Sequence, residues 1–150
     1  MNEILIVKCL SDNYAYIYSN KNGDAFVVDP SEAGPVIDVL NKHKLNLKFI
    51  LNTHHHFDHV GGNFELKEKY GCKIVGSKKD FERIPGIDIQ VSEGDIWNFD
   101  KHNAQIIEIP GHTTGHIAFY FESLKLVFTG DTLFSPVSYT HLRAHETKWH

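Results

Sequence analysis

The sequence contains few cysteines, no long apolar run and no block of basic residues, and each absence narrows the class of protein. Cys9 and Cys72 form no Cys-x-x-Cys pair and no disulfide framework, which favours a reducing compartment. No apolar stretch approaches the roughly 20 residues that cross a bilayer, and residues 1–8 lack the features of a signal peptide. The net charge of −4 includes no basic patch, which argues against nucleic acid. We therefore expect a cytoplasmic protein without a membrane or nucleic-acid partner.

Histidine, by contrast, is abundant. The 150 residues include 11 histidines, and these are clustered. Hydrophobic residues make up 41% of the chain and charged residues 23%, which is ordinary for a globular domain. A chain of this length can bury a core as a single domain. Clustered histidines in such a composition indicate a metal site.

Short apolar or aromatic runs separated by turn residues predict a series of strands. They lie at 4–7, 14–18, 25–28, 47–51, 73–75, 87–91, 96–99, 104–109, 117–121 and 126–128, with a hairpin turn at 20–23. Helical spacing is predicted over 36–43 and 64–70, and Gly71 ends the second helix. Strands with interspersed helices, and polar clusters on the loops that follow strands, predict an α/β layered domain.

One histidine cluster directly follows the strand predicted at 47–51. It reads Thr53-His54-His55-His56-Phe57-Asp58-His59. Alternate residues after a strand point the same way, so His54 and His56 can face one point while His55 faces elsewhere. Asp58 and His59 can serve a second point nearby. This spacing suits two metal ions about 3.5–4 Å apart, held by nitrogen and oxygen ligands.

Two later motifs add candidate ligands. His112 lies in Gly111-His112-Thr113-Thr114-Gly115-His116 between two predicted strands, where the glycines permit a tight backbone path toward the same pocket. His116 is expected to pack beside the site or to support a ligand. Asp131 follows the strand at 126–128 in Gly130-Asp131-Thr132, and we expect its carboxylate to bridge both ions.

These motifs resemble those of the metallo-β-lactamase fold superfamily and, within it, of glyoxalase II, the hydroxyacylglutathione hydrolases. The resemblance covers residues 1–135. The HxHxDH pattern marks the superfamily, whereas DNYxY near the start and GDTLF make the family assignment specific. The matching segments are LSDNYAY at 10–16, VDPSEA at 28–33, THHHFDHVGGN at 53–63 and GDTLF at 130–134.

The resemblance implies an α/β fold, a metallo-β-lactamase-like four-layer αβ/βα sandwich, with a binuclear metal centre. In that pattern the first ion is held by His54, His56 and His112, the second by Asp58 and His59, and Asp131 bridges them. Asp58 and Asp131 are the expected catalytic residues. Zinc is the expected metal, with iron or manganese as alternatives. The expected reaction is hydrolysis of the thioester of an S-(2-hydroxyacyl)glutathione such as S-D-lactoylglutathione, in which metal-activated water attacks the carbonyl.

The pattern of the family stops near Ser135. We expect residues 1–135 to form a catalytic domain that is incomplete at its C-terminus, because the family continues into further strands and a helical domain. Residues 136–150 include three histidines but no apolar face, and we interpret them as a disordered tail foreign to the family.

Three other readings stay open. One is another hydrolase of the same fold, such as a lactonase or a β-lactamase. A second is a persulfide dioxygenase that uses one iron. The third is a chain that binds metal without turnover. A complete set of histidines with two acids argues against a purely structural site, because structural zinc sites close with four ligands.

Overall fold

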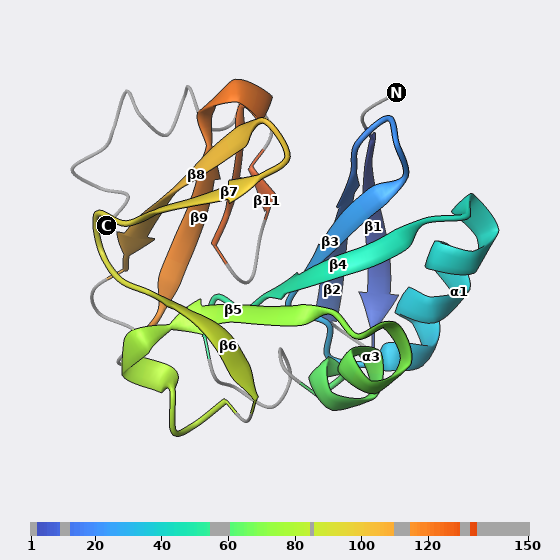
Figure 1. Ribbon diagram of the computed structural model, residues 1–150, viewed down its shortest axis with the longest axis horizontal. Helices are drawn as coiled ribbons and strands as arrows, with labels where there is room; N and C mark the ends of the chain where they lie inside the picture. Colours follow the sequence, from blue (N-terminus) through green and yellow to red (C-terminus); the bar gives the residue numbers. More distant parts are fainter. Residues whose placement is uncertain are drawn as a thin grey trace.

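The chain forms two β-sheets packed face to face, with helices on one side (Figure 1). The computed structural model describes residues 3–9, 13–54, 61–84, 86–109, 115–129 and 133–134. The strands of the first sheet follow one another in the order of the chain. They are β1 (Glu3–Cys9), β2 (Asn13–Ser19), β3 (Asp24–Val28), β4 (Asn46–Leu51), β5 (Lys73–Ser77) and β6 (Ile87–Val91).

The first sheet changes from antiparallel to parallel pairing at β3. β1, β2 and β3 pair antiparallel, whereas β3, β4, β5 and β6 pair parallel. The parallel part is buried on both faces, which explains the continuous apolar runs in β3 and at the end of β4. Parallel strands align their carboxyl ends, so the loops after β3, β4 and β5 meet at one edge of the sheet.

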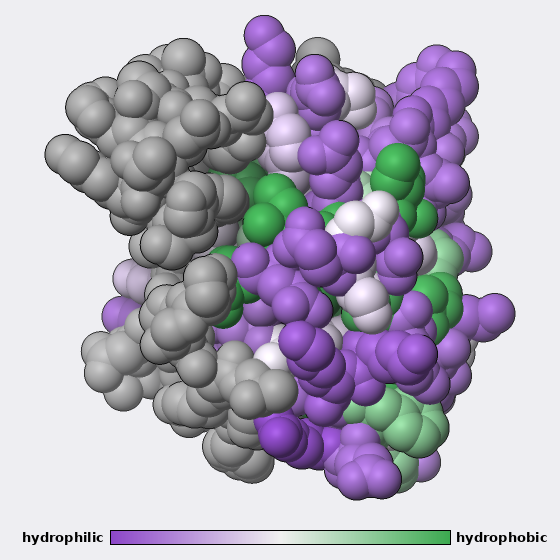
Figure 2. All heavy atoms as spheres, turned by 90° about the vertical axis from the view of Figure 1, so that its left-hand side faces the viewer, coloured by the Kyte–Doolittle hydropathy of each residue, from purple (hydrophilic) through white to green (hydrophobic). Residues whose placement is uncertain are grey.

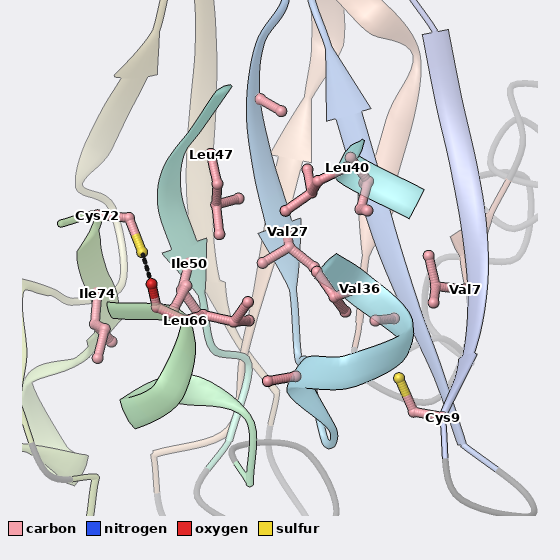
Figure 3. Close-up of a cluster of buried hydrophobic side chains, with 14 of the residues drawn as sticks. Val7, Cys9, Val27, Val36, Leu40, Leu47, Ile50, Leu66, Cys72 and Ile74 are labelled. Atoms are coloured by element: carbon pink, nitrogen blue, oxygen red, sulfur yellow. Dashed lines mark hydrogen bonds between the residues drawn. The ribbon is translucent and has the colours of Figure 1, made fainter. Parts of the chain in front are cut away.

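Two α-helices cover the outer face of this sheet. α1 (Ala33–His43) buries Ala33, Val36 and Leu40 at helical spacing, and α3 (Asn63–Tyr70) buries Leu66. Gly71 ends α3 in the left-handed conformation, φ 66°, as predicted. Figure 3 shows the cluster beneath the helices, where Val36 and Leu66 meet Val27 and Ile50 of the sheet.

The second sheet is antiparallel. Its strands, in spatial order, are β11 (Leu133–Phe134), β10 (Leu126–Phe128), β9 (Ile117–Phe121), β8 (His102–Glu108) and β7 (Ile96–Phe99). Side chains alternate along β7, with Trp97 and Phe99 buried and Ile96 and Asn98 exposed. Figure 2 shows the side of the molecule that lies at the left of Figure 1. The described surface there is mainly hydrophilic, with small hydrophobic areas between the polar ones. Short 3-10 turns η1 (Lys78–Asp80) and η2 (Glu122–Leu124) complete the described elements.

Aromatic side chains fill the space between the two sheets. Phe26 of β3 stacks on Phe121 of β9 with ring centroids 5.2 Å apart, and it meets Phe99 and Phe128 edge to face. This cluster and the aliphatic one under the helices place two core layers on opposite faces of the first sheet.

The α/β layered sandwich predicted from the sequence is confirmed, as are the predicted strands and both helices. The turn at 20–23 is also confirmed, since Asn20 and Asp24 close it through a backbone hydrogen bond. In the part of the chain that the structure describes, the layers are helices, first sheet and second sheet, and none of its α-helices is long and apolar enough to span a bilayer. The tail predicted at 136–150 lies outside the described residues, and the domain boundary at 135 stays a prediction.

Candidate metal centre

The first histidine of the HxHxDH motif lies at the carboxyl end of β4, directly beside the carboxyl end of β3. The two strands pair in parallel, with Val28 opposite Leu51. Asp29 therefore follows β3 next to the residues that follow β4. Asn52, Thr53 and His54 are all buried there, although each carries a polar side chain. Buried polar groups are normally hydrogen-bonded, so their partners define how this edge is built.

Asp29 holds Thr53 with both carboxylate oxygens. Its Oδ1 accepts a hydrogen bond from the Thr53 backbone N–H at 2.9 Å, and its Oδ2 accepts one from the Thr53 hydroxyl at 2.6 Å. Asp29 itself adopts the left-handed conformation, φ 51°, and its N–H donates to the Leu51 carbonyl at 2.9 Å. This turn of the backbone directs the carboxylate across to the neighbouring strand.

His54 is 6% exposed and is held on two sides. Its Nδ1 lies 2.8 Å from the Thr53 hydroxyl oxygen. Its ring lies against the ring of His116, with centroids 4.7 Å apart and planes at 31°. His116 in turn donates from Nε2 to the Thr129 carbonyl at 2.7 Å. His116 therefore packs against His54, as expected for a histidine beside the predicted site.

A backbone hydrogen bond joins the two sheets at this point. The N–H of Ile117, at the start of β9, donates to the carbonyl of Thr53 at 2.8 Å. The second sheet therefore meets the first where the histidine motif begins, and His116 is brought to His54 by this junction.

The two ends of the segment 55–60 are both anchored. At its far end, the Gly62 N–H donates to the Pro30 carbonyl at 2.7 Å, and a Cβ at Gly62 would lie 2.8 Å from the same oxygen. The side-chain amides of Asn52 and Asn63 hydrogen-bond to each other across the base of the segment. Asn52 and Asn63 are both buried, so the described residues on either side of 55–60 are held by hydrogen bonds.

The turn that precedes β9 rests on a buried carboxylate. Asp80 is fully buried after β5, and Arg83 contacts its Oδ1 at 3.2 Å. Gly115 lies over this carboxylate with φ +91°, and a Cβ there would be 2.6 Å from Oδ1. Only glycine fits both the conformation and the close approach. The carboxyl end of β5 thus supports the end of the loop that contains His112.

Of the six predicted ligands, the structure describes His54. The other five lie outside the described residues, so their ligand roles stay predictions: His56, Asp58, His59, His112 and Asp131. Among the residues that are described, no three histidine, cysteine or acidic side chains converge on one point.

Sequence reasoning gave no role to Asp29, Thr53 or Asp80. A signal was present for the first two, because Asp29 ends a buried apolar run and Thr53 immediately precedes His54. Polar residues at the carboxyl ends of neighbouring parallel strands are expected to meet. Asp80 follows β5 in the same way, but only the fold reveals its contact with Gly115.

A cleft of about 560 Å³ lies at the opposite end of the sandwich, near the starts of β4 and β5. Its walls include Phe49, Trp97 and Phe99, and the exposed Lys48 and Lys73 also line it. His54, the predicted ligand that the structure describes, does not line this cleft. This cleft and His54 therefore lie at opposite ends of the parallel strands.

His54, the predicted ligand that the structure describes, is of a type that divalent metal ions accept. Zn²⁺ binds imidazole nitrogen and carboxylate oxygen. Metal-bound histidines generally have their second ring nitrogen hydrogen-bonded, and His54 has this support at Nδ1.

The chain matches the family described as the Metallo-beta-lactamase superfamily over residues 10–143. It is 58% identical over 134 residues to the hydroxyacylglutathione hydrolase of Pelagibacter ubique, covering 89% of this chain and 56% of that protein. It is 46% identical over 136 residues to the protein of the same name from Methylococcus capsulatus, covering 90% and 53%. The chain thus spans about half the length of these curated relatives.

The fold is also found among solved structures. The B3 metallo-beta-lactamase BLEG-1 superposes with a TM-score of 0.79 at 21% sequence identity, covering 89% of this chain and 74% of that one. This likeness supports the α/β sandwich described above.

Proposed function

Because this chain belongs to the metallo-beta-lactamase superfamily, we propose that it is a metal-dependent thioester hydrolase. The substrate is an S-(2-hydroxyacyl)glutathione such as S-D-lactoylglutathione, and the products are glutathione and a 2-hydroxy acid. The observation that carries the proposal is the 58% identity to a hydroxyacylglutathione hydrolase across 89% of the chain. The position of His54 supports the proposal, because Thr53 and His116 hold this first histidine of the HxHxDH motif in place.

The superfamily implies divalent-metal binding, and the proposed centre holds two ions, most readily zinc. When bound, these ions polarise the thioester carbonyl and lower the pKa of water toward neutrality. The proposed ligands of the first ion are His54, His56 and His112, those of the second are Asp58 and His59, and Asp131 contacts both.

The reaction consumes one water. Its oxygen adds to the carbonyl carbon, the carbon–sulfur bond breaks, and the glutathione sulfur leaves as a thiol after receiving a proton. Asp58 is proposed to orient the attacking water, because a carboxylate accepts a hydrogen bond from it. The His54 imidazole is held in one orientation, because Thr53 and His116 restrain two sides of the ring.

A cytoplasmic location belongs to the same proposal. Cys9 and Cys72 are both free thiols, which fits a reducing compartment where glutathione is available.

Thiol release from S-D-lactoylglutathione, followed with an aromatic disulfide reagent, tests the activity. Both protein thiols are buried, and burial raises the pKa of Cys72 to about 11, so the protein contributes a low background. We expect zinc-dependent turnover that falls roughly 100-fold or more in kcat/KM for His54→Ala, because one ligand is lost.

The matched control is His43→Ala, an exposed histidine in the last turn of α1. It should retain the original rate. Equal activity in His54→Ala and the original chain would contradict the proposed site. Faster hydrolysis of a lactone or a β-lactam than of the thioester would assign a different hydrolase, and zinc binding without any turnover would leave only the metal site.

A further inference from the structure

We propose that Asp29 and Thr53 are positioning residues that set the protonation of the His54 ring, with the proton on Nδ1 and the lone pair on Nε2 toward the metal. This inference rests on the metal site proposed above. It assigns to two residues outside the expected ligand set the task of preparing one ligand before the ion arrives.

The direction of the hydrogen bonds begins at Asp29. An ionised carboxylate can only accept hydrogen bonds, and both oxygens of Asp29 accept one from Thr53, from the backbone N–H and from the hydroxyl. Asp29 is 1% exposed, so these bonds replace the water that the carboxylate gave up on burial.

The single proton of a threonine hydroxyl can be donated only once. Because the Thr53 hydroxyl donates to Asp29 at 2.6 Å, its contact with His54 at 2.8 Å must be one in which Thr53 accepts. The donor is then Nδ1–H of the imidazole. A neutral ring protonated at Nδ1 carries its lone pair on Nε2, which is the form that coordinates a metal through Nε2.

The backbone and the neighbouring ring hold this arrangement in place. The left-handed conformation of Asp29 is one that aspartate and asparagine tolerate better than other non-glycine residues. His116 packs on the face of His54 at 4.7 Å and is itself tied to the Thr129 carbonyl. The His54 ring is therefore restrained against rotation while Thr53 determines which nitrogen is protonated.

One isosteric change, Asp29→Asn, should reverse the direction of the two hydrogen bonds that the Thr53 hydroxyl makes with residue 29 and with His54. The Thr53 backbone N–H keeps the amide oxygen facing it, so the new NH₂ group must point at the Thr53 hydroxyl. That hydroxyl then donates to Nδ1 of His54 and forces the proton onto Nε2. Thr53→Val removes the hydroxyl with little change of shape, and Thr53→Ser is the matched control that keeps it.

Two measurements test the proposal on the 150-residue chain. Long-range ¹H–¹⁵N correlation spectra without zinc report which nitrogen of His54 carries the proton, the ring being assigned by its loss in His54→Ala. Competition with a chromophoric chelator gives the zinc dissociation constant. We expect Nδ1–H in the original chain and Nε2–H in Asp29→Asn. Zinc should bind roughly 10–100-fold more weakly in Asp29→Asn and Thr53→Val, and within about three-fold of the original in Thr53→Ser.

The proposal is wrong if Asp29→Asn keeps the proton on Nδ1, or if both weakened variants bind zinc within about two-fold of the original. Thermal unfolding of each variant establishes that it is folded. If Thr53→Val does not fold, Asp29→Asn alone tests the proposal. If the original chain binds no zinc, the proposed metal site is wrong. The spectra still show whether Asp29 and Thr53 determine which nitrogen of His54 is protonated.

Discussion

The two ends of the parallel strands differ in whether their polar side chains are buried or exposed. At the carboxyl end, Asp29, Thr53 and Asp80 are almost completely buried, and Asp29 and Thr53 are hydrogen-bonded to each other. At the amino end, the charged groups Lys48 and Lys73 are exposed beside a wide aromatic cleft. Burying a charge without a partner is costly, whereas exposing one costs almost nothing.

The buried polar end is therefore the one at which we propose the chemistry. An open cleft can result simply from two sheets that diverge. A buried carboxylate that orients a threonine beside a histidine requires matched partners from separate strands, and it specifies positions to within a hydrogen bond. Among the described residues, the hydrogen-bonded buried polar groups lie beside His54, whereas the aromatic cleft lies at the other end of the strands.

Gly115→Ala should produce the largest loss at the carboxyl end. The new Cβ would be strained at φ +91° and would collide with the Asp80 carboxylate. We expect the free energy of unfolding in urea to fall by about 4 kcal/mol, from left-handed strain plus disruption of a buried charge. Gly94→Ala is the control, because Gly94 has φ +87° but open space around it, and it should lose about 1–2 kcal/mol. Equal losses would show that Asp80 does not support this turn.

Asn63→Ala tests the amide pair that closes the base of the histidine motif. It removes one partner of the fully buried Asn52 amide, and we expect a loss of about 2 kcal/mol in the free energy of unfolding. Asn52→Ala and the double variant complete a double-mutant cycle, in which the double variant should lose less than the sum of the singles. Additive losses would mean that the two amides act independently.

Asp88→Asn probes the amino end, where the smallest effect is expected. Burial raises the pKa of Asp88, but hydrogen bonds from Lys67 and the Ile74 N–H outweigh burial and leave the pKa below its ordinary value. Its stabilisation is therefore present above the unfolded pKa and is lost as pH falls through the folded one.

The Asp88 side chain is about a third exposed, so solvent screens the pair. We expect Asp88→Asn to lower the free energy of unfolding by about 0.5–1 kcal/mol at pH 7, and the difference to shrink below about pH 4. Glu68→Gln, an exposed carboxylate on α3, should change it by less than about 0.5 kcal/mol. A difference for Asp88→Asn that stays constant from pH 7 to pH 3 would contradict the assignment.

Local pattern was enough to predict most of the fold. The apolar run of β3, the alternation of β7 and the stop of α3 at Gly71 all follow from nearest neighbours and periodicity. The lengths of the strands were harder to predict from the sequence. β1 and β2 pair along their whole extent and therefore run beyond the apolar residues that predicted them.

The site was predictable only in part. The spacing of the histidine motif predicted His54 as a ligand, and that role stays a prediction; of the two glycines around His112, the structure describes Gly115, which has a positive φ. The contacts of Asp29 with Thr53 and of Asp80 with Gly115 were not predicted, because each joins residues more than one element apart. Such pairs depend on which strands become neighbours, and no local period contains that information.

The hydrogen bond from Ile117 to the Thr53 carbonyl also has a consequence for the order of folding. It links segments of different sheets that are far apart in the chain, so closing it costs more chain entropy than closing a local hairpin, and we expect it to form later. His54 and His116 meet only when that docking is complete. An ion that binds the docked arrangement alone would stabilise it by mass action. Metal binding would then act on the docking of the two sheets, because it would stabilise the arrangement in which His54 and His116 are in contact.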